Sequence, residues 1–182
     1  MCCCDPYATE QPICCQCCDP YAGGGGDEVT LVVPAGSSHD FWLGTRTGVT
    51  DMRAQADTDF DVSTSFDLAP AADTVHGLLV GDSDLLGVGQ FIRFDVYNAG
   101  SVMLFAANDT GSIFHNAPWP VGDNHLRIKR SGNDFDCYSS PDGVAWSLVA
   151  AIPYIMTVSQ VGLWAGNFNS NPAHTVTFSN QL

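Results

Sequence analysis

The sequence contains few basic residues. Only six of its 182 residues are Lys or Arg, against twenty Asp or Glu, so the formal net charge is −14. Nucleic-acid binding depends on clustered basic groups that release counterions from phosphate. The one basic cluster, residues 127–130, has its charges at the spacing of outward strand positions, and we expect it to be solvated surface. Nucleic acid is therefore not an expected partner.

Long hydrophobic runs and an export signal are also missing. The longest apolar run, residues 148–156, has nine residues and is interrupted by Pro153, whereas a membrane span needs roughly 20. The first residues show neither the basic nor the apolar region of a classical signal peptide. We expect no membrane span and a place in an extracellular particle. Either an export signal was removed, or the protein leaves the cell by another route, such as lysis.

Cysteine is concentrated at one end of the chain. Seven of the eight cysteines lie within the first 18 residues, and the sequence CCDPYA at residues 3–8 recurs at residues 17–22, just before a tetraglycine. Glycine runs are typical of flexible spacers, and a short repeat indicates two equivalent units. We therefore divide the chain into a docking arm (1–22), a linker (23–27) and a folded body (28–182).

The clustered cysteines must be bonded to something, because the Asp, Pro, Gln and Tyr residues around them provide no core in which thiols could be buried. One option is disulfide bonding, within the arm or between subunits, and the odd number leaves one thiol for a neighbour. The other is zinc, although adjacent cysteines chelate a single ion poorly. The seven are Cys2, Cys3, Cys4, Cys14, Cys15, Cys17 and Cys18. Residues 1–26 are thus expected to contact other subunits of a homo-oligomer or larger assembly.

The body has the pattern of β-strands throughout. Within residues 57–68, Phe60, Val62 and Phe66 alternate with polar residues, which is the period of a strand with one buried face. Cys137 shares a face with Phe135, so we expect it to be a core thiol. Further strands are predicted at residues 29–33, 75–80, 91–97, 102–106, 112–115, 125–130, 135–139, 145–150, 158–165 and 175–179.

Short strands at near-regular spacing, without helical periodicity, predict an all-β fold: a two-sheet antiparallel jelly-roll β-sandwich behind an irregular arm. The clearest turn is SSPDGVAW at residues 139–146, where Pro141 and the pair Asp142-Gly143 supply hairpin dihedrals. Trp146, which follows directly, is expected to pack into the core.

Three passages of the body resemble the concanavalin-A-like lectin and glucanase superfamily of jelly rolls, especially bacterial laminin-G-like modules. They are FDVSTSF (60–66) leading to HGLLV (76–80), then LRIKRSG (126–132), then YSSPDGVAW (138–146). The resemblance covers residues 57–182, about two thirds of the chain. It implies a curved sandwich whose concave sheet or rim loops hold carbohydrate.

Glutamate is nearly absent, which argues against catalysis. The glucanases of this superfamily use two glutamates, one as nucleophile and one as acid, whereas this sequence has only Glu10 and Glu28. Aspartate pairs at positions 82 and 84, or 134 and 136, are more simply explained as surface acids. The sequence contains neither a Gly-x-Ser-x-Gly nor a His-Glu-x-x-His motif. We expect a protein that is not an enzyme.

Two segments combine an aromatic ring with amide or imidazole groups. Sugar-binding sites use this mixture because a sugar ring presents apolar C–H faces as well as hydroxyls. The candidates for contact with a cell-surface glycan are His115, Asn116 and Trp119 in one segment and Trp164, Asn167 and Asn169 in the other. For both tryptophans, packing in the core is the competing expectation.

Loop aspartates indicate a candidate metal site. Calcium prefers several oxygen ligands, and Asp82, Asp84 and Asp123 are the candidates. The three aspartates within residues 57–61 share a strand face by their spacing, and we expect them to form a solvated acidic stripe.

Together these features favour a bacteriophage virion component, such as a minor tail, baseplate or decoration protein, which docks through its arm and displays a glycan-binding sandwich. The alternative is a self-assembling extracellular filament whose subunits are crosslinked through the arm. A glycosidase ranks third, and it would require activity that depends on Asp82 or Asp134.

Overall fold

The residues that the structure describes are 28–181 of this computed structural model, and they contain fourteen strands and no helix. The strands are β1 (Glu28–Val33), β2 (Phe41–Trp42), β3 (Thr45–Arg46), β4 (Val49–Ala54), β5 (Phe60–Phe66), β6 (Thr74–Gly81), β7 (Phe91–Asn98), β8 (Val102–Asn108), β9 (Ile113–Pro118), β10 (His125–Ser131), β11 (Asp134–Ser140), β12 (Ser147–Pro153), β13 (Gln160–Asn167) and β14 (His174–Gln181). The all-β prediction is confirmed.

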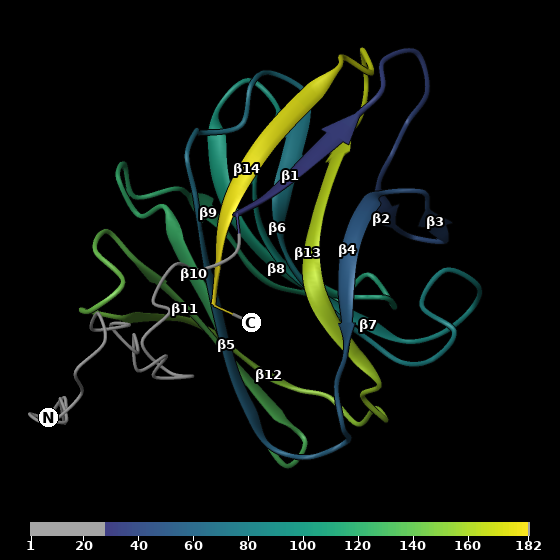
Figure 1. Cartoon of the computed structure of the whole chain (residues 1–182), viewed down its shortest axis with the longest axis vertical. Coiled ribbons are helices and arrows are strands. Elements are labelled where there is room, and N and C mark those ends of the chain that lie inside the picture. The colour runs from purple at the N-terminus through teal and green to yellow at the C-terminus, as the bar shows by residue number, and fades with distance from the viewer. Residues whose placement is uncertain (1–27, 182) are drawn as a thin grey trace, which may run out of the picture.

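Two six-stranded antiparallel sheets form the sandwich (Figure 1). The first sheet has the order β1-β14-β5-β10-β11-β12, and the second has the order β4-β13-β6-β7-β8-β9. The remaining two strands, β2 and β3, form a small hairpin. In both large sheets the chain leaves a strand and returns to a non-adjacent one, as in a jelly-roll-like sandwich.

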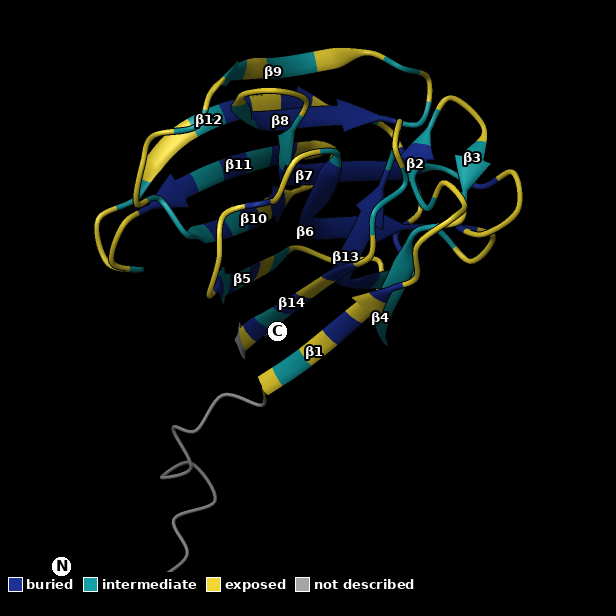
Figure 2. Ribbon diagram, turned by 90° about the horizontal axis from the view of Figure 1, so that it is seen from above, coloured by how far each residue is buried: buried dark blue, intermediate teal, exposed yellow. Residues whose placement is uncertain are grey.

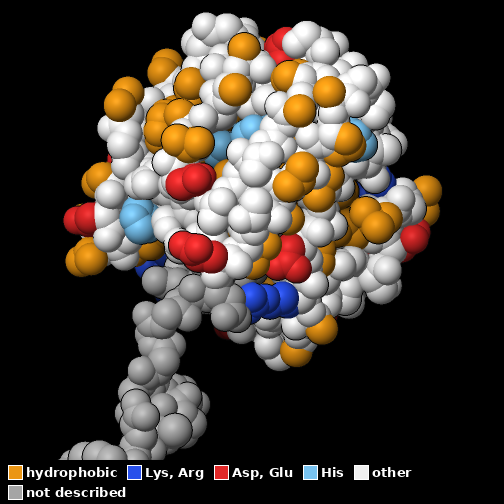
Figure 3. Space-filling model, turned by 45° about the horizontal axis from the view of Figure 1, so that its top comes forward, with side chains coloured by type: hydrophobic (Ala, Val, Ile, Leu, Met, Phe, Trp, Pro, Cys, Tyr) orange, Lys and Arg blue, Asp and Glu red, His pale blue; other side chains and the backbone are white. Residues whose placement is uncertain are grey.

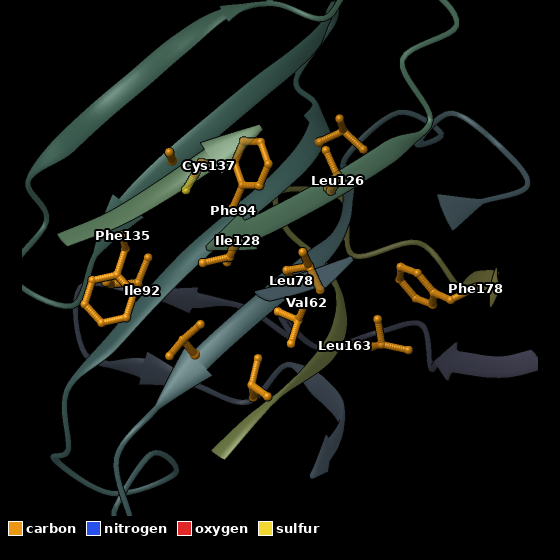
Figure 4. Close-up of a cluster of buried hydrophobic side chains, with 14 of the residues drawn as sticks. Val62, Leu78, Ile92, Phe94, Leu126, Ile128, Phe135, Cys137, Leu163 and Phe178 are labelled. Atoms are coloured by element: carbon orange, nitrogen blue, oxygen red, sulfur yellow. The ribbon is translucent and has the colours of Figure 1, made fainter. Parts of the chain in front are cut away.

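The main hydrophobic core lies between the two sheets (Figure 4). Leu78 and Phe94 reach it from the second sheet, while Ile128, Phe135 and Cys137 reach it from the first, and all five are fully buried. Each large apolar side chain placed there stabilises the fold by about 1.5–3 kcal/mol relative to an exposed position. Figure 2 shows the resulting contrast between the buried central strands and the more exposed edge strands β9 and β12.

A second, smaller core lies on the outer side of the second sheet. Phe41 in β2 is completely buried against Trp164 and Phe91, with ring centroids 5.5 Å and 5.7 Å apart. The chain segment that carries β2 and β3 therefore covers part of a sheet face that would otherwise meet solvent. Gly48 is needed for this cover, because a Cβ there would lie 2.6 Å from the Phe41 ring.

Every strand predicted from the sequence is present, with ends that differ by up to three residues. Three strands were missed, β2, β3 and β4. The first two have only two residues each, which is too short for a period of two to appear. In β4 every residue but the last is half-buried, because the strand is an edge of its sheet.

Cys137 is a free, buried thiol, as expected, but Trp146 is not in the core. It is half-buried on the outer face of the first sheet, where Arg127 lies 5.4 Å from its ring centroid. Residues 127–130 are not simply solvated either. Arg130 is 6% exposed and donates to Asp57 at 2.6 Å, because it occupies an inward position at the end of β10.

The three aspartates of the expected solvated stripe are exposed, and each carboxylate also has a partner on or beside β10. Asp57 accepts from Arg130, Asp59 accepts from the backbone N–H of Gly132 at 2.7 Å, and Asp61 pairs with Arg127. The hydrogen bonds from Arg130 and Arg127 hold the pKa values of Asp57 and Asp61 below the usual range. The stripe thus joins β5 and the loop before it to β10.

Candidate functional site

The outer face of the second sheet carries polar and aromatic residues in the middle of β7. Ile92, Phe94 and Val96 point into the main core, so alternation along the strand turns Arg93, Asp95 and Tyr97 to the outer face. The hairpin of β2 and β3 stands over this face, which leaves a partly covered cavity instead of an open sheet surface.

This cavity, called here the Trp42 cavity, has a volume of about 240 Å³. Its lining comes from β2, β7, β8, β9 and the loops beside them. The lining residues are Asp40, Trp42, Arg93, Tyr97, Phe105, Ile113, Asn116 and Phe168. It is smaller than the cavities that hold drug-sized ligands, which exceed about 300 Å³, so its size suits a small chemical unit.

Aromatic rings fix the walls of the Trp42 cavity. Trp42 meets Phe105 edge to face with ring centroids 5.7 Å apart, and Tyr97 meets Phe105 at 5.6 Å. Phe168 packs on the other side of Tyr97 at 6.2 Å. Such edge contacts restrain ring orientation. Trp42, Tyr97 and Phe168 are each half-buried, so part of each ring remains accessible.

Two polar side chains, Asn116 and Asp40, line the same cavity. The Tyr97 hydroxyl donates to Oδ1 of Asn116 at 2.9 Å, which orients the amide group. Asp40 accepts one hydrogen bond from Arg93 at 3.1 Å and one from the backbone N–H of Phe41 at 2.7 Å. The cavity thus places an oriented amide and a carboxylate beside aromatic rings.

Arg93 forms the floor of the cavity and is 5% exposed. Its guanidinium donates to both carboxylate oxygens of Asp95, at 2.6 Å and 3.0 Å, and to the carbonyl of Phe41 at 2.8 Å. It also lies over the rings of Phe105 and Trp164, 5.0 Å and 4.5 Å from their centroids. The planar cation is satisfied on its edges and on its faces, so it acts as a fixed support.

Asp95 is completely buried below this floor. Burial disfavours its charged form and raises its pKa to about 6, although the charge of Arg93 acts in the opposite direction. Both of its oxygens are held by Arg93, and it does not line the cavity. Asp40 is therefore the only carboxylate among the described residues that lines this cavity.

The structure separates His115, Asn116 and Trp119, which were expected to act together. Asn116 lies opposite Phe105 in the β8–β9 ladder and reaches the Trp42 cavity, whereas His115 lies opposite Ala106 and therefore faces the other side of the sheet. Trp119 packs on the main core, and its indole N–H donates to the carbonyl of Asp123 at 2.9 Å. Of the three, only Asn116 reaches the cavity.

The second expected group, Trp164, Asn167 and Asn169, has no common ligand surface. Trp164 and Asn167 are 0% exposed. The Asn167 side chain joins two loops by accepting from the N–H of His39 and donating to the carbonyls of Pro34 and Pro172. Asn169 is exposed and donates to Asp73 at 3.0 Å. Trp164 and Asn167 are therefore buried structural residues and, contrary to the expectation from the sequence, present no surface to a glycan.

The calcium candidates are not gathered into one site. Asp82 accepts from the backbone N–H groups of Asp84 and Gln90, and Asp84 accepts from that of Val88. Asp123 lies on a different loop and accepts from the hydroxyl of Ser139 in β11. Within residues 28–181 no three His, Cys, Asp or Glu side chains are placed to hold a metal ion. The seven arm cysteines lie outside the described residues, so both disulfide bonding and zinc binding stay predictions.

Comparison with known proteins adds information on the fold. No family model and no curated protein sequence matches this chain. Among solved structures, a functionally unknown protein from Saccharomyces cerevisiae is 21% identical, with a TM-score of 0.58 over 84% of each chain. A Bacillus licheniformis β-glucanase is 10% identical, with a TM-score of 0.53 over 84% of this chain and 76% of its own.

A third match is the CBM2 module of the evolved Dit protein of Lactobacillus casei BL23 phage J-1. It is 6% identical, with a TM-score of 0.51 over 82% of this chain and 80% of its own. At identities this low the similarity establishes the fold alone: this chain shares its sandwich fold with a glucanase and with a phage module.

Among the described residues there is no helix of the length and apolarity that a membrane crossing requires.

Most residues of the Trp42 cavity were missed by the sequence analysis. Trp42 lies in a two-residue strand, and Tyr97 and Phe105 belong to strands whose aromatic residues look like core residues. One signal was available. In β7, Arg93 and Asp95 interrupt an otherwise apolar run at a spacing of two, which indicates a strand face that is covered but not filled with apolar side chains.

Proposed function

We propose that this protein is a non-enzymatic surface-binding protein whose sandwich binds glycan in the Trp42 cavity. The observation that carries the proposal is the combination of accessible aromatic rings with an oriented amide and a carboxylate in one small cavity. The rings suit the C–H face of a sugar, and Asn116 and Asp40 suit its hydroxyls. The volume fits one sugar unit or the end of a chain.

The carboxyl groups of the cavity support binding without hydrolysis. Glycoside hydrolysis uses two carboxyl groups on either side of the scissile bond. In this cavity Asp40 is alone on the surface, and Asp95 is committed to Arg93 with both oxygens. The only glutamate among the described residues, Glu28, lies on the edge strand β1. This arrangement favours a lectin-like role over that of a glucanase.

The particle that displays the sandwich is proposed to be a bacteriophage virion, with residues 1–26 attached to neighbouring subunits. Support comes from the repeated cysteine motif, from the low number of basic residues, and from the shared sandwich of the phage Dit module. Figure 3 shows one face of the sandwich, on which Lys and Arg are sparse and apolar side chains are scattered between uncharged groups.

The binding proposal is tested with the purified full chain on a glycan array and on whole bacterial cells. Trp42→Ala should weaken binding to each positive glycan by about 2 kcal/mol, roughly 30-fold in Kd, as expected for an aromatic anchor. The matched control is Val121→Ala, which trims a side chain that is 95% exposed and outside the cavity. Equal binding by wild type and Trp42→Ala, or no binding to any glycan or cell, would refute the proposal.

The seven arm cysteines also favour the filament as a second candidate function. Non-reducing gels distinguish the virion component from the filament. A ladder of covalent multimers that collapses with reductant supports a crosslinked filament, whereas a monomer band that attaches to purified virions supports a docking arm.

A further inference from the structure

A second cavity lies on the outer face of the first sheet, on the opposite side of the sandwich from the Trp42 cavity. It has a volume of about 220 Å³, which again suits a small unit. The hairpin loop between β11 and β12 forms one wall, and strands β5, β10 and β14 form the other. The lining residues are Ser63, Thr64, Ser65, His125, Asp142, Gly143, Val144, Trp146 and Ser179.

The sheet side of this cavity is a row of polar residues in register. Ser179 in β14 is paired with Ser65 in β5, Ser65 is paired with His125 in β10, and His125 is paired with Ser140 in β11. Residues directly opposite in antiparallel strands place their side chains on the same face, about 5 Å apart. Hydroxyl and imidazole groups are therefore lined up across four strands.

The hairpin side of the cavity is held by its own hydrogen bonds. Oδ1 of Asp142 accepts from the backbone N–H groups of Val144 and Ala145, both at 2.9 Å, and from the hydroxyl of Ser140, also at 2.9 Å. Gly143 has φ +70° and lies so close to His125 that a Cβ would be 3.0 Å from the imidazole Nδ1. The loop conformation is thus set by the chain itself, before any ligand is present.

Trp146 ends this hairpin and provides the aromatic surface of the cavity. Its ring meets His125 edge to face, with centroids 6.5 Å apart, and Arg127 stacks on it. Arg127 also pairs with Asp61, so its charge is already compensated. Trp146 is held in place by these contacts but remains half-buried.

We propose that this second cavity, named here the Trp146 cavity, is a further binding site for a neutral sugar unit. The proposal rests on the glycan-binding function proposed above and extends it to two separate sites on opposite faces of one sandwich. Each chain would then bind one sugar unit on each face of the sandwich and could join two separate glycans.

The chemistry of the Trp146 cavity favours a neutral polyol over an ion. An anion would need uncompensated cationic or clustered N–H donors, but Arg127 is paired with Asp61 and Asp142 adds negative charge. A metal ion would need several carboxylates or imidazoles, and the lining supplies one of each. Hydroxyls, one imidazole and one tryptophan ring match sugar hydroxyls and a sugar C–H face.

NMR titration of the full chain tests both sites separately. The probes are glucose, galactose, N-acetylglucosamine and rhamnose, with their β-linked disaccharides, at millimolar concentration. The readout is the indole N–H signal of each of the four tryptophans, assigned with Trp42→Phe and Trp146→Phe. The spectrum of each variant also shows whether the variant is folded.

The expected result is that at least one sugar shifts the Trp146 signal, with an affinity that His125→Ala weakens at least tenfold and that Trp42→Ala leaves unchanged. If sugars shift only the Trp42 signal, the second site is refuted and the proposed function stands. If they shift only the Trp146 signal, the Trp42 cavity fails as the glycan site and the Trp146 cavity stands. If neither signal moves with any probe, both proposals are refuted.

Discussion

The buried pair of His76 and His174 makes the stability of this protein depend on pH in a way that can be calculated. His76 in β6 is 0% exposed between the rings of Phe66 and Phe178, and its Nδ1 lies 3.1 Å from Nε2 of His174. Its other ring nitrogen, Nε2, has no hydrogen-bond partner in the described part of the protein. Burial, and then the nearby His174, lower the pKa of His76 from 6.5 to about 3.

The direction of the pH dependence of stability follows from which state, folded or unfolded, binds the proton. Below pH 6.5 the unfolded chain protonates at this position and the folded protein does not, so stability is present above pH 6.5 and is lost as the pH falls towards 3. The loss is about 2 kcal/mol between pH 8 and pH 5, and about 5 kcal/mol below pH 3. Asp95 contributes with the opposite sign, because its raised pKa of about 6 makes the folded state gain stability as the pH falls through 6.

Urea unfolding of wild type and His76→Phe between pH 8 and pH 5 compares two proteins that both contain Asp95 and His174, so the difference between them reports the titration of His76. Packing differences change the unfolding free energy of the variant by the same amount at every pH, so the value at pH 8 serves as the internal reference. The difference in unfolding free energy should change by about 2 kcal/mol in favour of His76→Phe at pH 5. If the unfolding free energies of the two proteins change in parallel with pH, His76 is not the acid-sensitive group and this explanation is wrong.

Three further predictions concern the cavity floor and the core. Arg93→Met should destabilise the protein by about 3–5 kcal/mol in urea unfolding at pH 7.5, because it leaves Asp95 buried without its cation. Adding Asp95→Leu should recover most of the lost stability, and no recovery would contradict the role of this ion pair. Gly77→Ala should cost more than about 1 kcal/mol in thermal unfolding, since its Cβ would lie 2.4 Å from the carbonyl oxygen of Phe94, and an unchanged melting temperature would contradict that contact. Burial raises the pKa of the Cys137 thiol, so peptide mass spectrometry should find it alkylated by iodoacetamide in urea but not in the folded protein; rapid labelling without urea would show that the core is open.

Much of the fold could be predicted because alternation of apolar and polar residues reports one buried face directly. This held for β5, where Val62 and Phe66 enter the core, and for β11, where Phe135 and Cys137 do. It failed for Trp146, because a tryptophan after a tight turn has the same local pattern whether it packs inward or lies against Arg127 on the outer face. Periodicity gives the face of a strand but not the path of the loop that follows it.

The candidate site was harder to predict because its residues come together only through the order of the strands. Trp42, Tyr97, Asn116 and Phe168 are spread over more than a hundred residues and are joined when the β2–β3 hairpin covers the second sheet. Asn116, which was expected to contact a glycan, does line the Trp42 cavity, and the contact itself stays a prediction. His115 does not line the cavity, because neighbouring residues of one strand point to opposite faces.

The edge position of β1 has a mechanical consequence. The body begins at Glu28, the first residue of β1, and among the described residues this strand forms a ladder with β14 alone, with Glu28 opposite Ser179. If a sandwich anchored through its arm holds a glycan on a cell, tension between the two enters the fold through this single ladder. The rupture force of a single molecule should therefore depend on the six residue pairs between β1 and β14 as well as on the sugar contacts.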